Sequence, residues 1–166
     1  MEMWTNMKLP AEYLIPQYQD RLYGAAFAVL QNGADAADAV QMTFIKYVDK
    51  DLEYKDEAHI RAWLFKTVIN QAKDIRRSFF RSHKVSIEAA INLHFEQEED
   101  QILFETVCQL PEKDRTVLQL YYYEDYPIKE IARILGIRES NVKKRLSRAR
   151  SKLKNVLQEN WNDENE

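Results

Sequence analysis

Apolar side chains recur at helical spacing through most of the chain, and each stripe predicts one helix. The first helix is expected over residues 11–30, with an apolar stripe of Tyr18, Leu22, Ala25, Ala26 and Val29. The Asn32-Gly33 pair then interrupts the pattern. A second helix is expected over residues 34–48, with a stripe of Ala37, Val40, Phe44 and Val48.

A third helix is expected over residues 58–80, after a charged loop at residues 49–57. Its apolar stripe follows the spacing of one buried helix face and consists of Leu64, Val68, Ala72, Ile75 and Phe79. A second stripe on the opposite face is basic and carries one amide. It consists of Lys66, Asn70, Lys73 and Arg77. A solvated face and a nucleic-acid face both fit this stripe.

Residues 81–99 lose clear periodicity and turn acidic, which predicts a linker with a short helical turn at residues 87–93. Helical spacing resumes at about Asp100 and continues through Leu110. Pro111 suits the first position of the next helix, which is expected to run to about Tyr123.

The last third of the chain carries the pattern of a helix-turn-helix. A short amphipathic helix is predicted from Ile128, Ile131, Ala132 and Leu135. Gly136 follows where a left-handed residue is expected. A second helix is predicted from Val142, Leu146, Ala149 and Leu153. In such motifs the second helix enters the major groove of DNA.

A helical wheel at about 100° per residue separates the faces of that second helix. The face opposite Val142 and Leu146 holds Ser140, Lys144, Ser147 and Ser151, with Arg148 beside them. Lysine, arginine and serine hydrogen-bond to base edges. The flanks, where phosphates would lie, hold Lys143, Arg145 and Arg150. An ordinary helical hairpin with a basic surface is the structural alternative.

The formal net charge of −3 argues against nucleic-acid binding only until its distribution is considered. Lysine and arginine concentrate in residues 61–84 and again in residues 138–154, and acidic residues lie between these stretches. This predicts a protein that touches DNA at two places and binds it weakly alone.

Only 3 Gly and 4 Pro occur in 166 residues, which favours an all-α chain. Cys108 is the single cysteine and lies in an apolar helical pattern, so a buried side chain is expected. No apolar run has the length of a signal peptide or a membrane span, and a cytoplasmic location is therefore expected.

Several segments resemble extracytoplasmic-function sigma factors of bacterial RNA polymerase. The similarity to their region 4 is carried by residues 110–115 (LPEKDR), 129–132 (KEIA), 135–137 (LGI) and 142–150 (VKKRLSRAR). The similarity to region 2 is carried by residues 20–23 (DRLY), 35–41 (DAADAVQ), 61–65 (RAWLF), 68–70 (VIN) and 74–77 (DIRR). The first dozen residues, the linker and the tail lie outside this resemblance.

The resemblance implies three binding faces and no catalysis. The −35 promoter element would be read by Ser140, Lys143, Lys144, Arg145, Ser147, Arg148 and Arg150. The −10 element would be melted and read by His59, Arg61, Trp63, Lys66, Asn70, Lys73, Asp74 and Arg77. The loop at residues 55–60 matches the segment that pockets a flipped-out base in the family. The β′ clamp of core RNA polymerase would bind Asp35, Asp38, Gln41, Met42 and Ile45.

The resemblance also implies a domain division and a set of partners, and the sequence differs from the family pattern at two positions. We expect a region 2-like domain at residues 1–81, a linker at 82–99, a region 4-like domain at 100–158 and an acidic tail at 159–166. The partners would be promoter DNA, the polymerase β′ clamp and β flap, and an anti-sigma factor, with no small-molecule substrate. Met42 replaces the usual acidic residue after the glutamine, and Pro127 replaces the usual capping serine, which leaves Asp125 as the candidate cap.

Two other function classes are alternatives, an enzyme and a DNA-binding regulator that acts without polymerase. An enzyme is disfavoured because His59, His83 and His94 show no metal-ligand spacing and no glycine-rich phosphate loop exists. No cofactor and no metal are therefore expected. A regulator that binds duplex DNA without polymerase accounts for residues 111–155. It does not account for the helix at 58–80, where aromatics beside cations suit unstacked bases.

Overall fold

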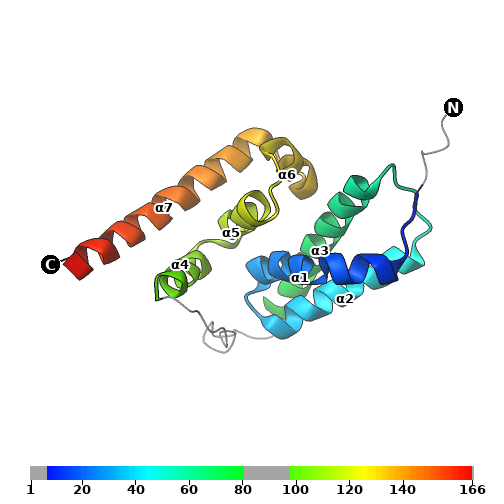
Figure 1. The fold of residues 1–166 in the computed structure, drawn as a ribbon, viewed down its shortest axis with the longest axis horizontal. Helices are drawn as coiled ribbons and strands as arrows, with labels where there is room; N and C mark the ends of the chain where they lie inside the picture. The colour runs from blue at the N-terminus through cyan, green and yellow to red at the C-terminus, as the bar shows by residue number, and fades with distance from the viewer. Residues whose placement is uncertain (1–6, 81–97, 166) are drawn as a thin grey trace. The chain divides into compact units, whose positions relative to one another are not determined.

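The computed structural model describes residues 7–80 and 98–165, which belong to two compact units. One unit extends over Met1–Ala90 and the other over Ile91–Glu166 (Figure 1). Every regular element of the described residues is a helix, apart from one isolated β-bridge between Met7 and Tyr54. The predicted all-α class is confirmed.

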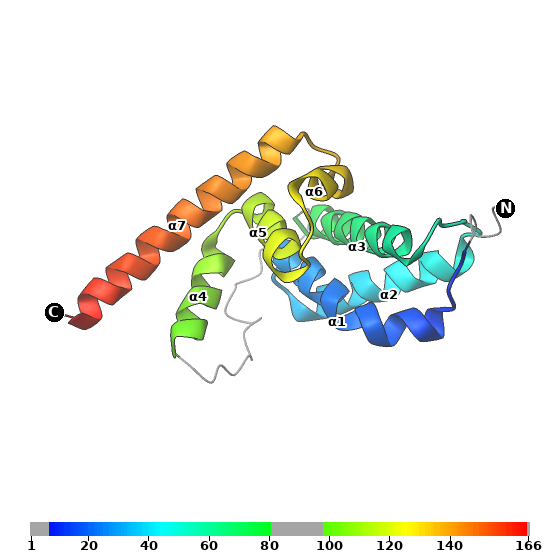
Figure 2. The same cartoon turned by 45° about the horizontal axis from the view of Figure 1, so that its top comes forward.

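The first unit packs three helices against one another, as two views of the chain show (Figures 1 and 2). They are α1 (Ala11–Leu30), α2 (Gly33–Asp49) and α3 (Glu57–Phe80). The predicted stripe of α1 is buried throughout, and Leu14 extends it by one turn. The core is formed where the apolar faces of all three helices meet.

The buried face of α2 differs from the predicted one. Ala37 and Val48 were expected inside, but both are exposed, with Val48 at 59%. The buried side chains are Ala36, Ala39, Val40, Thr43, Phe44 and Tyr47. The face is rotated because Tyr47, an aromatic with 1% exposure, takes the inner position at the end of the helix. Small alanines at both 36 and 37 fit either rotation.

Helix α3 follows its predicted pattern closely. Leu64, Val68 and Ala72 are buried and Ile75 is half-buried, while the Phe79 side chain lies outside the described residues. The preceding loop is not wholly polar, because Tyr54 in its middle is buried to 1% exposure. A solvent-exposed loop was predicted here because most residues in 49–57 are charged, and the burial of Tyr54 was therefore not expected.

The second unit contains four α-helices and one π-helical turn among its described residues. They are α4 (Glu98–Gln109), α5 (Glu112–Leu118), η2 (Gln119–Tyr123), α6 (Ile128–Leu135) and α7 (Glu139–Asn165). Pro111 caps α5 from just outside, one position before the expected site. The predicted helix ending at Tyr123 is therefore continuous, with its last turn widened in η2. The predicted turn at residues 87–93 lies outside the described residues.

The helix-turn-helix is formed by α6, Gly136 and α7. Gly136 adopts a φ of 66°, the left-handed conformation expected of it, and its N–H donates to the carbonyl oxygens of Ala132 and Arg133. Leu135 and Leu153 of the predicted stripes are half-buried, whereas Val142, Leu146 and Ala149 are buried.

Two smaller expectations resolve in opposite ways. Cys108 is buried, as predicted. Asp125 does not cap α6: the helix is preceded by Pro127 and has no side-chain cap, and Asp125 itself sits at a φ of 55°. Asp125 therefore supplies a turn rather than a cap. Among the described helices, none has the length and apolar character to cross a bilayer.

Candidate nucleic-acid and polymerase interfaces

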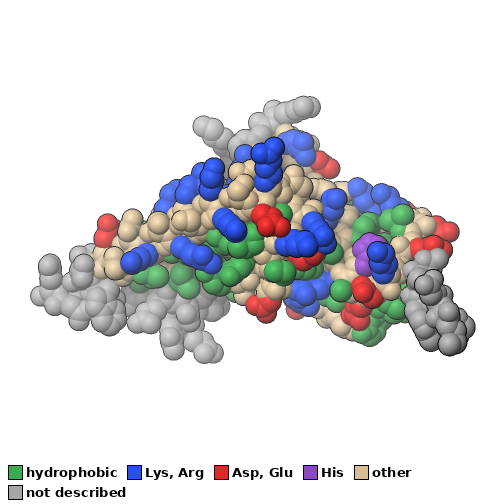
Figure 3. Space-filling view, turned by 90° about the horizontal axis from the view of Figure 1, so that it is seen from above, with side chains coloured by type: hydrophobic (Ala, Val, Ile, Leu, Met, Phe, Trp, Pro, Cys, Tyr) green, Lys and Arg blue, Asp and Glu red, His purple; other side chains and the backbone are tan. Residues whose placement is uncertain are grey.

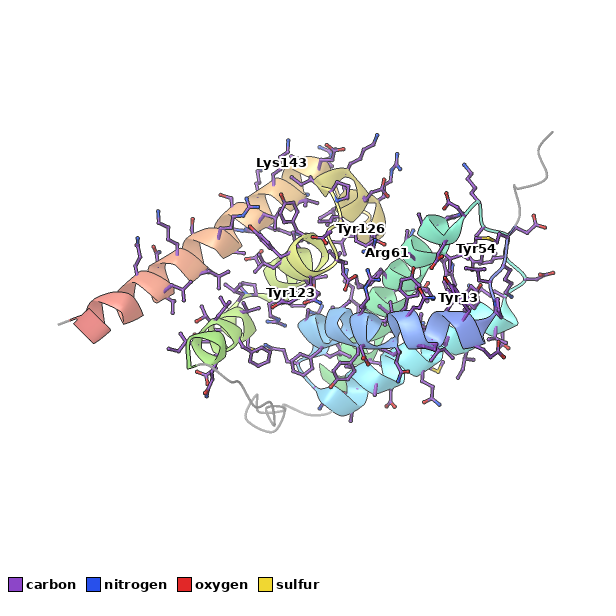
Figure 4. The ribbon with its side chains drawn as sticks, in the orientation of Figure 1. Tyr13, Tyr54, Arg61, Tyr123, Tyr126 and Lys143 are labelled. Carbon is purple, nitrogen blue, oxygen red and sulfur yellow. The ribbon has the colours of Figure 1, made fainter. Side chains whose placement is uncertain are left out.

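The outer face of α7 carries the predicted base-edge readers. Figure 3 shows lysine and arginine side chains gathered along this helix, and Lys143 projects outward near its start (Figure 4). Three buried residues, Val142, Leu146 and Ala149, fix the opposite side against α5 and α6. The exposed members of the predicted set are Ser140, Lys143, Lys144, Ser147, Arg148 and Arg150. Arg145 is half-buried.

Arg148 is held in place by a carboxylate that the sequence did not single out. Its Nη2 lies 3.3 Å from Oδ1 of Asp114 on α5. The Asp114 side chain is 2% exposed, while the Arg148 side chain is 62% exposed. A buried carboxylate is costly unless it is paired, so this contact joins α5 to α7. The same contact leaves most of the guanidinium open to solvent.

Arg150 takes a different course from the other cations of α7. Its Nε donates to the Tyr122 hydroxyl at 2.7 Å, and its guanidinium lies 5.3 Å from the ring centre of Tyr121. These contacts direct the guanidinium toward the π-helical turn η2. The hydrogen bond that Arg150 donates to Tyr122 raises the pKa of the guanidinium above its usual value. In this structure Arg150 links α7 to η2 and is not arranged as a simple phosphate contact.

The polar face of α3 combines cations, an amide and an ion pair. Lys66, Asn70, Asp74 and Arg77 are exposed, and Lys73 is half-buried. Arg77 Nη2 lies 2.9 Å from Asp74 Oδ1, with both side chains more than half exposed. An exposed i, i+3 pair of this kind contributes about 0.2–0.5 kcal/mol. The pair explains how a carboxylate is tolerated on this basic face. Asn70 is exposed on the same face, one turn before Asp74.

The loop before α3 is ordered by two local hydrogen bonds. Asp56 Oδ1 accepts from the backbone N–H of His59 at 2.8 Å, the pattern of a helix N-cap. The His59 Nδ1 accepts from the backbone N–H of Lys55 at 3.1 Å. His59 therefore closes the loop upon itself while its ring stays exposed.

Aromatic side chains lie beneath this loop. The Trp63 ring is 5.9 Å from Tyr47 and 6.1 Å from Tyr54, and it is half-buried. Phe65 is fully buried, with the Arg61 guanidinium 5.9 Å from its ring centre. Burial raises the pKa of Tyr54 to about 12, so this tyrosine is neutral at physiological pH.

Helix α1 fixes the start of α3 from the other side. The hydroxyls of Tyr18 and Tyr13 donate to the Glu57 carboxylate at 3.0 and 3.4 Å, and Tyr13 is labelled in Figure 4. Burial, together with the Glu57 carboxylate, raises the pKa of Tyr18. These two hydrogen bonds attach the first turn of α3 to α1, at the point where the loop ends and the helix begins.

The side chains predicted to contact polymerase lie on the exposed face of α2. Asp38, Gln41, Met42 and Ile45 are all exposed, with Met42 at 43% and Ile45 at 44%. Asp35 lies in the first turn and is half-buried, and its backbone N–H is capped by Asn32. Val48 lies three residues after Ile45 and continues the apolar stripe. Val48 was not among the predicted contact residues because the apolar spacing of residues 34–48 assigned it to the buried side.

The candidate side chains of both units lie on exposed helix faces. No cluster of three His, Cys, Asp or Glu side chains able to hold a metal occurs within residues 7–80 and 98–165. The structure instead presents a basic helix in each unit, one of them the second helix of a helix-turn-helix. These features define a DNA-binding protein of the helix-turn-helix class.

The comparisons with known proteins make the identification specific. Residues 14–82 match the family model "Sigma-70 region 2", and residues 100–153 match "Sigma-70, region 4". The chain is similar to RNA polymerase sigma factor SigZ of Bacillus subtilis, with 33% identity over 130 residues, covering 73% of this chain and 72% of that protein. It is also similar to RNA polymerase sigma factor SigV of Bacillus subtilis, with 29% identity over 138 residues, covering 81% and 83%.

The fold comparison agrees. The sigma factor RpoE of Bartonella quintana, solved in complex with the anti-sigma factor NepR, has the same fold, with a TM-score of 0.75 at 22% identity. The likeness covers 89% of this chain and 96% of that one. The chain belongs to the extracytoplasmic-function sigma factors. Such proteins bind core RNA polymerase and direct it to promoters through the −10 and −35 elements.

Proposed function

We propose that the two basic helices of this sigma factor divide promoter recognition between them, α7 reading intact duplex and α3 opening and holding the melted strand. The observation that carries the proposal is the difference in what surrounds each set of cations. On α7 they lie among serines on one continuous helix face. On α3 they share a face with the amide of Asn70, and Trp63 near the start of the same helix is half-buried against Tyr47 and Tyr54.

At the −35 element, the outer face of α7 would supply both base-edge and phosphate contacts. Lys144, Ser147 and Arg148 are the base-edge readers, since they lie opposite the buried stripe. Ser140 lies on the same face as these readers, and Lys143 and Arg145 flank them and suit phosphates. Arg150 belongs to the same proposed set, and its bond to Tyr122 would have to open before it reached a phosphate.

At the −10 element, α3 and the loop before it would act together. Asn70 and Asp74 offer hydrogen-bonding groups to unpaired bases, while Lys66, Lys73 and Arg77 offset phosphate charge. Arg61, His59 and Trp63 complete the set. Trp63 is half-buried among tyrosines and presents a partly open ring, and bases stack on such rings.

The exposed α2 stripe is proposed as the β′ clamp contact. Its acidic and amide members, Asp35, Asp38 and Gln41, lie on the same helix as the apolar Met42 and Ile45. Val48 extends that apolar part by one turn. An apolar centre with a polar rim is the usual composition of a specific protein interface.

The remaining assignments concern partners and setting. The second unit would also contact the β flap, and the exposed faces would be covered by an anti-sigma factor when the protein is inactive. The protein would act in the cytoplasm, where polymerase and promoter DNA meet, and would perform no catalysis itself. The working division is a region 2-like domain at 1–81, a linker at 82–99, a region 4-like domain at 100–158 and an acidic tail at 159–166.

A gel shift with and without core RNA polymerase tests this proposal against duplex binding by an independent regulator. The template is a promoter selected from a randomised library with the holoenzyme. We expect the full chain to bind the template tightly only when core polymerase is present. Equally tight and specific binding by the chain alone would favour the independent regulator and contradict the division of work between α3 and α7.

A further inference from the structure

A short segment before α1 is attached to the loop that precedes α3. Residues 7–10 lie outside the match to region 2, which begins at residue 14. The Met7 N–H donates to the Tyr54 carbonyl at 2.8 Å, and the Tyr54 N–H donates to the Met7 carbonyl at 3.2 Å. These two bonds form an isolated antiparallel bridge. The segment is therefore fixed to the middle of the loop.

Lys8 makes a second attachment at the end of α2. Its Nζ donates to the Lys50 carbonyl at 2.7 Å and lies 5.3 Å from the Tyr47 ring centre. The last carbonyls of a helix have no partner within the helix, and a cation is favourable there because of the helix dipole. Lys8 thus fixes the point at which the chain leaves α2 and enters the loop.

Tyr47 makes a third attachment, from inside the core. Its hydroxyl donates to the Leu9 carbonyl at 2.5 Å, and its ring is 1% exposed. The ring stacks on Tyr54 at 5.7 Å. Tyr54 in turn meets the edge of His59 at 5.3 Å. A continuous series of contacts therefore runs from the N-terminal segment to the exposed ring of His59.

The register of the loop depends on these attachments. Tyr54 directly precedes Lys55, whose N–H is the donor to His59 Nδ1. A shift of Tyr54 would therefore change the position of the His59 ring and of the Asp56 cap. The segment bonds the backbone of Tyr54 and of Lys50 directly, so what it fixes there is loop geometry rather than general burial.

We propose that residues 7–10 are a positioning element that sets the conformation of the −10-contacting loop. The positioning residues are Lys8 in this segment and Tyr47 on α2, which bonds the segment at Leu9. This inference rests on the proposed function of the loop in holding an unpaired promoter base. Neither residue needs to touch DNA for it to hold. Tyr47 is fully buried, so its effect can only be transmitted through its neighbours.

Two matched pairs of variants separate positioning from charge and from burial. Tyr47→Phe removes the hydroxyl that bonds Leu9, whereas Tyr54→Phe removes a buried hydroxyl that has no hydrogen-bond partner. Lys8→Met removes the donor to the Lys50 carbonyl. Lys50→Met removes a cation from the same place but keeps that carbonyl.

The experiment uses holoenzyme assembled from the full chain and core polymerase. A fork template with a duplex upstream half and a randomised unpaired downstream strand is selected with wild-type holoenzyme. The measurement is the ratio of affinities for the selected base and for a substituted base. Loss of one hydrogen bond changes an equilibrium about five-fold, so we expect roughly a five-fold loss of this ratio in Tyr47→Phe and in Lys8→Met. Core assembly and upstream duplex binding should stay unchanged.

Several results would overturn the inference. Unchanged discrimination in both Tyr47→Phe and Lys8→Met would do so. An equal loss in Lys50→Met would assign the effect to charge, and an equal loss in Tyr54→Phe would assign it to general packing. His59→Ala tests the underlying function separately. If His59→Ala lowers discrimination and the two positioning variants do not, only the inference fails; if His59→Ala has no effect, the role of the loop at −10 fails.

Discussion

Helices α3 and α7 both carry a row of cations, but they are built differently. Helix α3 is buried along one face in a three-helix core, and its polar face includes the Asp74–Arg77 pair and Asn70. Helix α7 packs against α4, α5 and α6 and is bonded to η2 through Arg150, and its exposed face is basic and hydroxyl-rich. The α3 face also continues into an ordered loop underlain by aromatic rings.

On the proposed division of work, the groups that surround the cations, and not charge alone, specify the form of DNA that each helix binds. Phosphate contacts are available to both helices and position the protein without reading sequence. Long side chains on an uninterrupted helix reach base edges in the major groove. An amide, a carboxylate and open aromatic rings instead suit bases that have left the stack. The proposed difference in function between α3 and α7 can be tested with variants at several positions.

The largest effect is expected from the α2 face, because on the proposed division of work both helices act on promoters only in holoenzyme. Gln41→Arg combined with Ile45→Glu places charges in the centre of the proposed clamp contact. We expect assembly with purified core polymerase to be lost, since buried unpaired charge is strongly unfavourable at an interface. The helical circular dichroism should be unchanged because both positions are exposed. Normal assembly would show that the clamp binds elsewhere.

A large but more selective effect is expected at Arg148. Loss of a base-edge contact costs about 1–3 kcal/mol at one position, so Arg148→Ala should weaken promoter binding and relax preference at one or two upstream base pairs. Quantitative binding to a set of single-base promoter variants measures this. Uniform weakening across all variants would make Arg148 a phosphate contact.

The ion pair with Asp114 complicates that variant and also supplies its control. Arg148→Ala leaves the buried Asp114 carboxylate without this partner. Asp114→Asn keeps Arg148 and removes only the charge that orients it. If α7 reads bases through an oriented Arg148, Asp114→Asn should relax preference at the same base pairs. If the pair serves stability alone, Asp114→Asn should lower the unfolding temperature with base preference intact.

An intermediate effect is expected at the turn of the helix-turn-helix. Gly136 has a φ of 66° and open space where a Cβ would stand, so Gly136→Ala is strained through the backbone alone. A left-handed conformation costs a residue with a Cβ about 1–2 kcal/mol. Thermal unfolding of the full chain should record this loss. Gly136→Asn should lose less, because asparagine tolerates the left-handed region, and equal losses would argue against backbone strain.

The smallest effect is expected from the exposed pair on α3. Asp74→Asn removes the charge partner of Arg77, and an exposed i, i+3 pair contributes about 0.2–0.5 kcal/mol to stability. Denaturant unfolding should therefore change little. A loss of stability above about 1 kcal/mol would mean that Asp74 is a structural residue. In that case its variants could not be used to probe strand opening.

The sequence was sufficient for features that depend on one helix at a time. The α3 stripe, the left-handed Gly136 and the exposed α2 set follow from spacing or local conformation, and the structure agrees with them. Contacts between helices could not be predicted from the sequence pattern. A wheel places Arg148 and Arg150 on α7 but cannot show Asp114 or Tyr122, which lie on other elements.

Two further differences have the same origin. Val48 was assigned to the core because helical spacing does not show which of two nearby apolar residues is buried. In the structure Tyr47 is the buried one. Tyr54 was overlooked because its neighbours are charged, although its backbone pairs with Met7. The N-terminal segment has no periodicity, so nothing in its sequence indicated that it is attached to a loop more than forty residues away.

Permanganate reactivity of unpaired thymines tests the division between α3 and α7 most directly. The assay compares Asn70→Ala with Arg148→Ala in holoenzyme, on a duplex promoter and on the same promoter with a pre-melted bubble. We predict that Asn70→Ala leaves closed-duplex binding nearly unchanged but slows strand opening, and that the bubble bypasses this kinetic defect. The bubble should rescue Arg148→Ala poorly. Normal opening by a variant that combines Asn70→Ala with Asp74→Ala would contradict the account and make the polar face of α3 a structural surface.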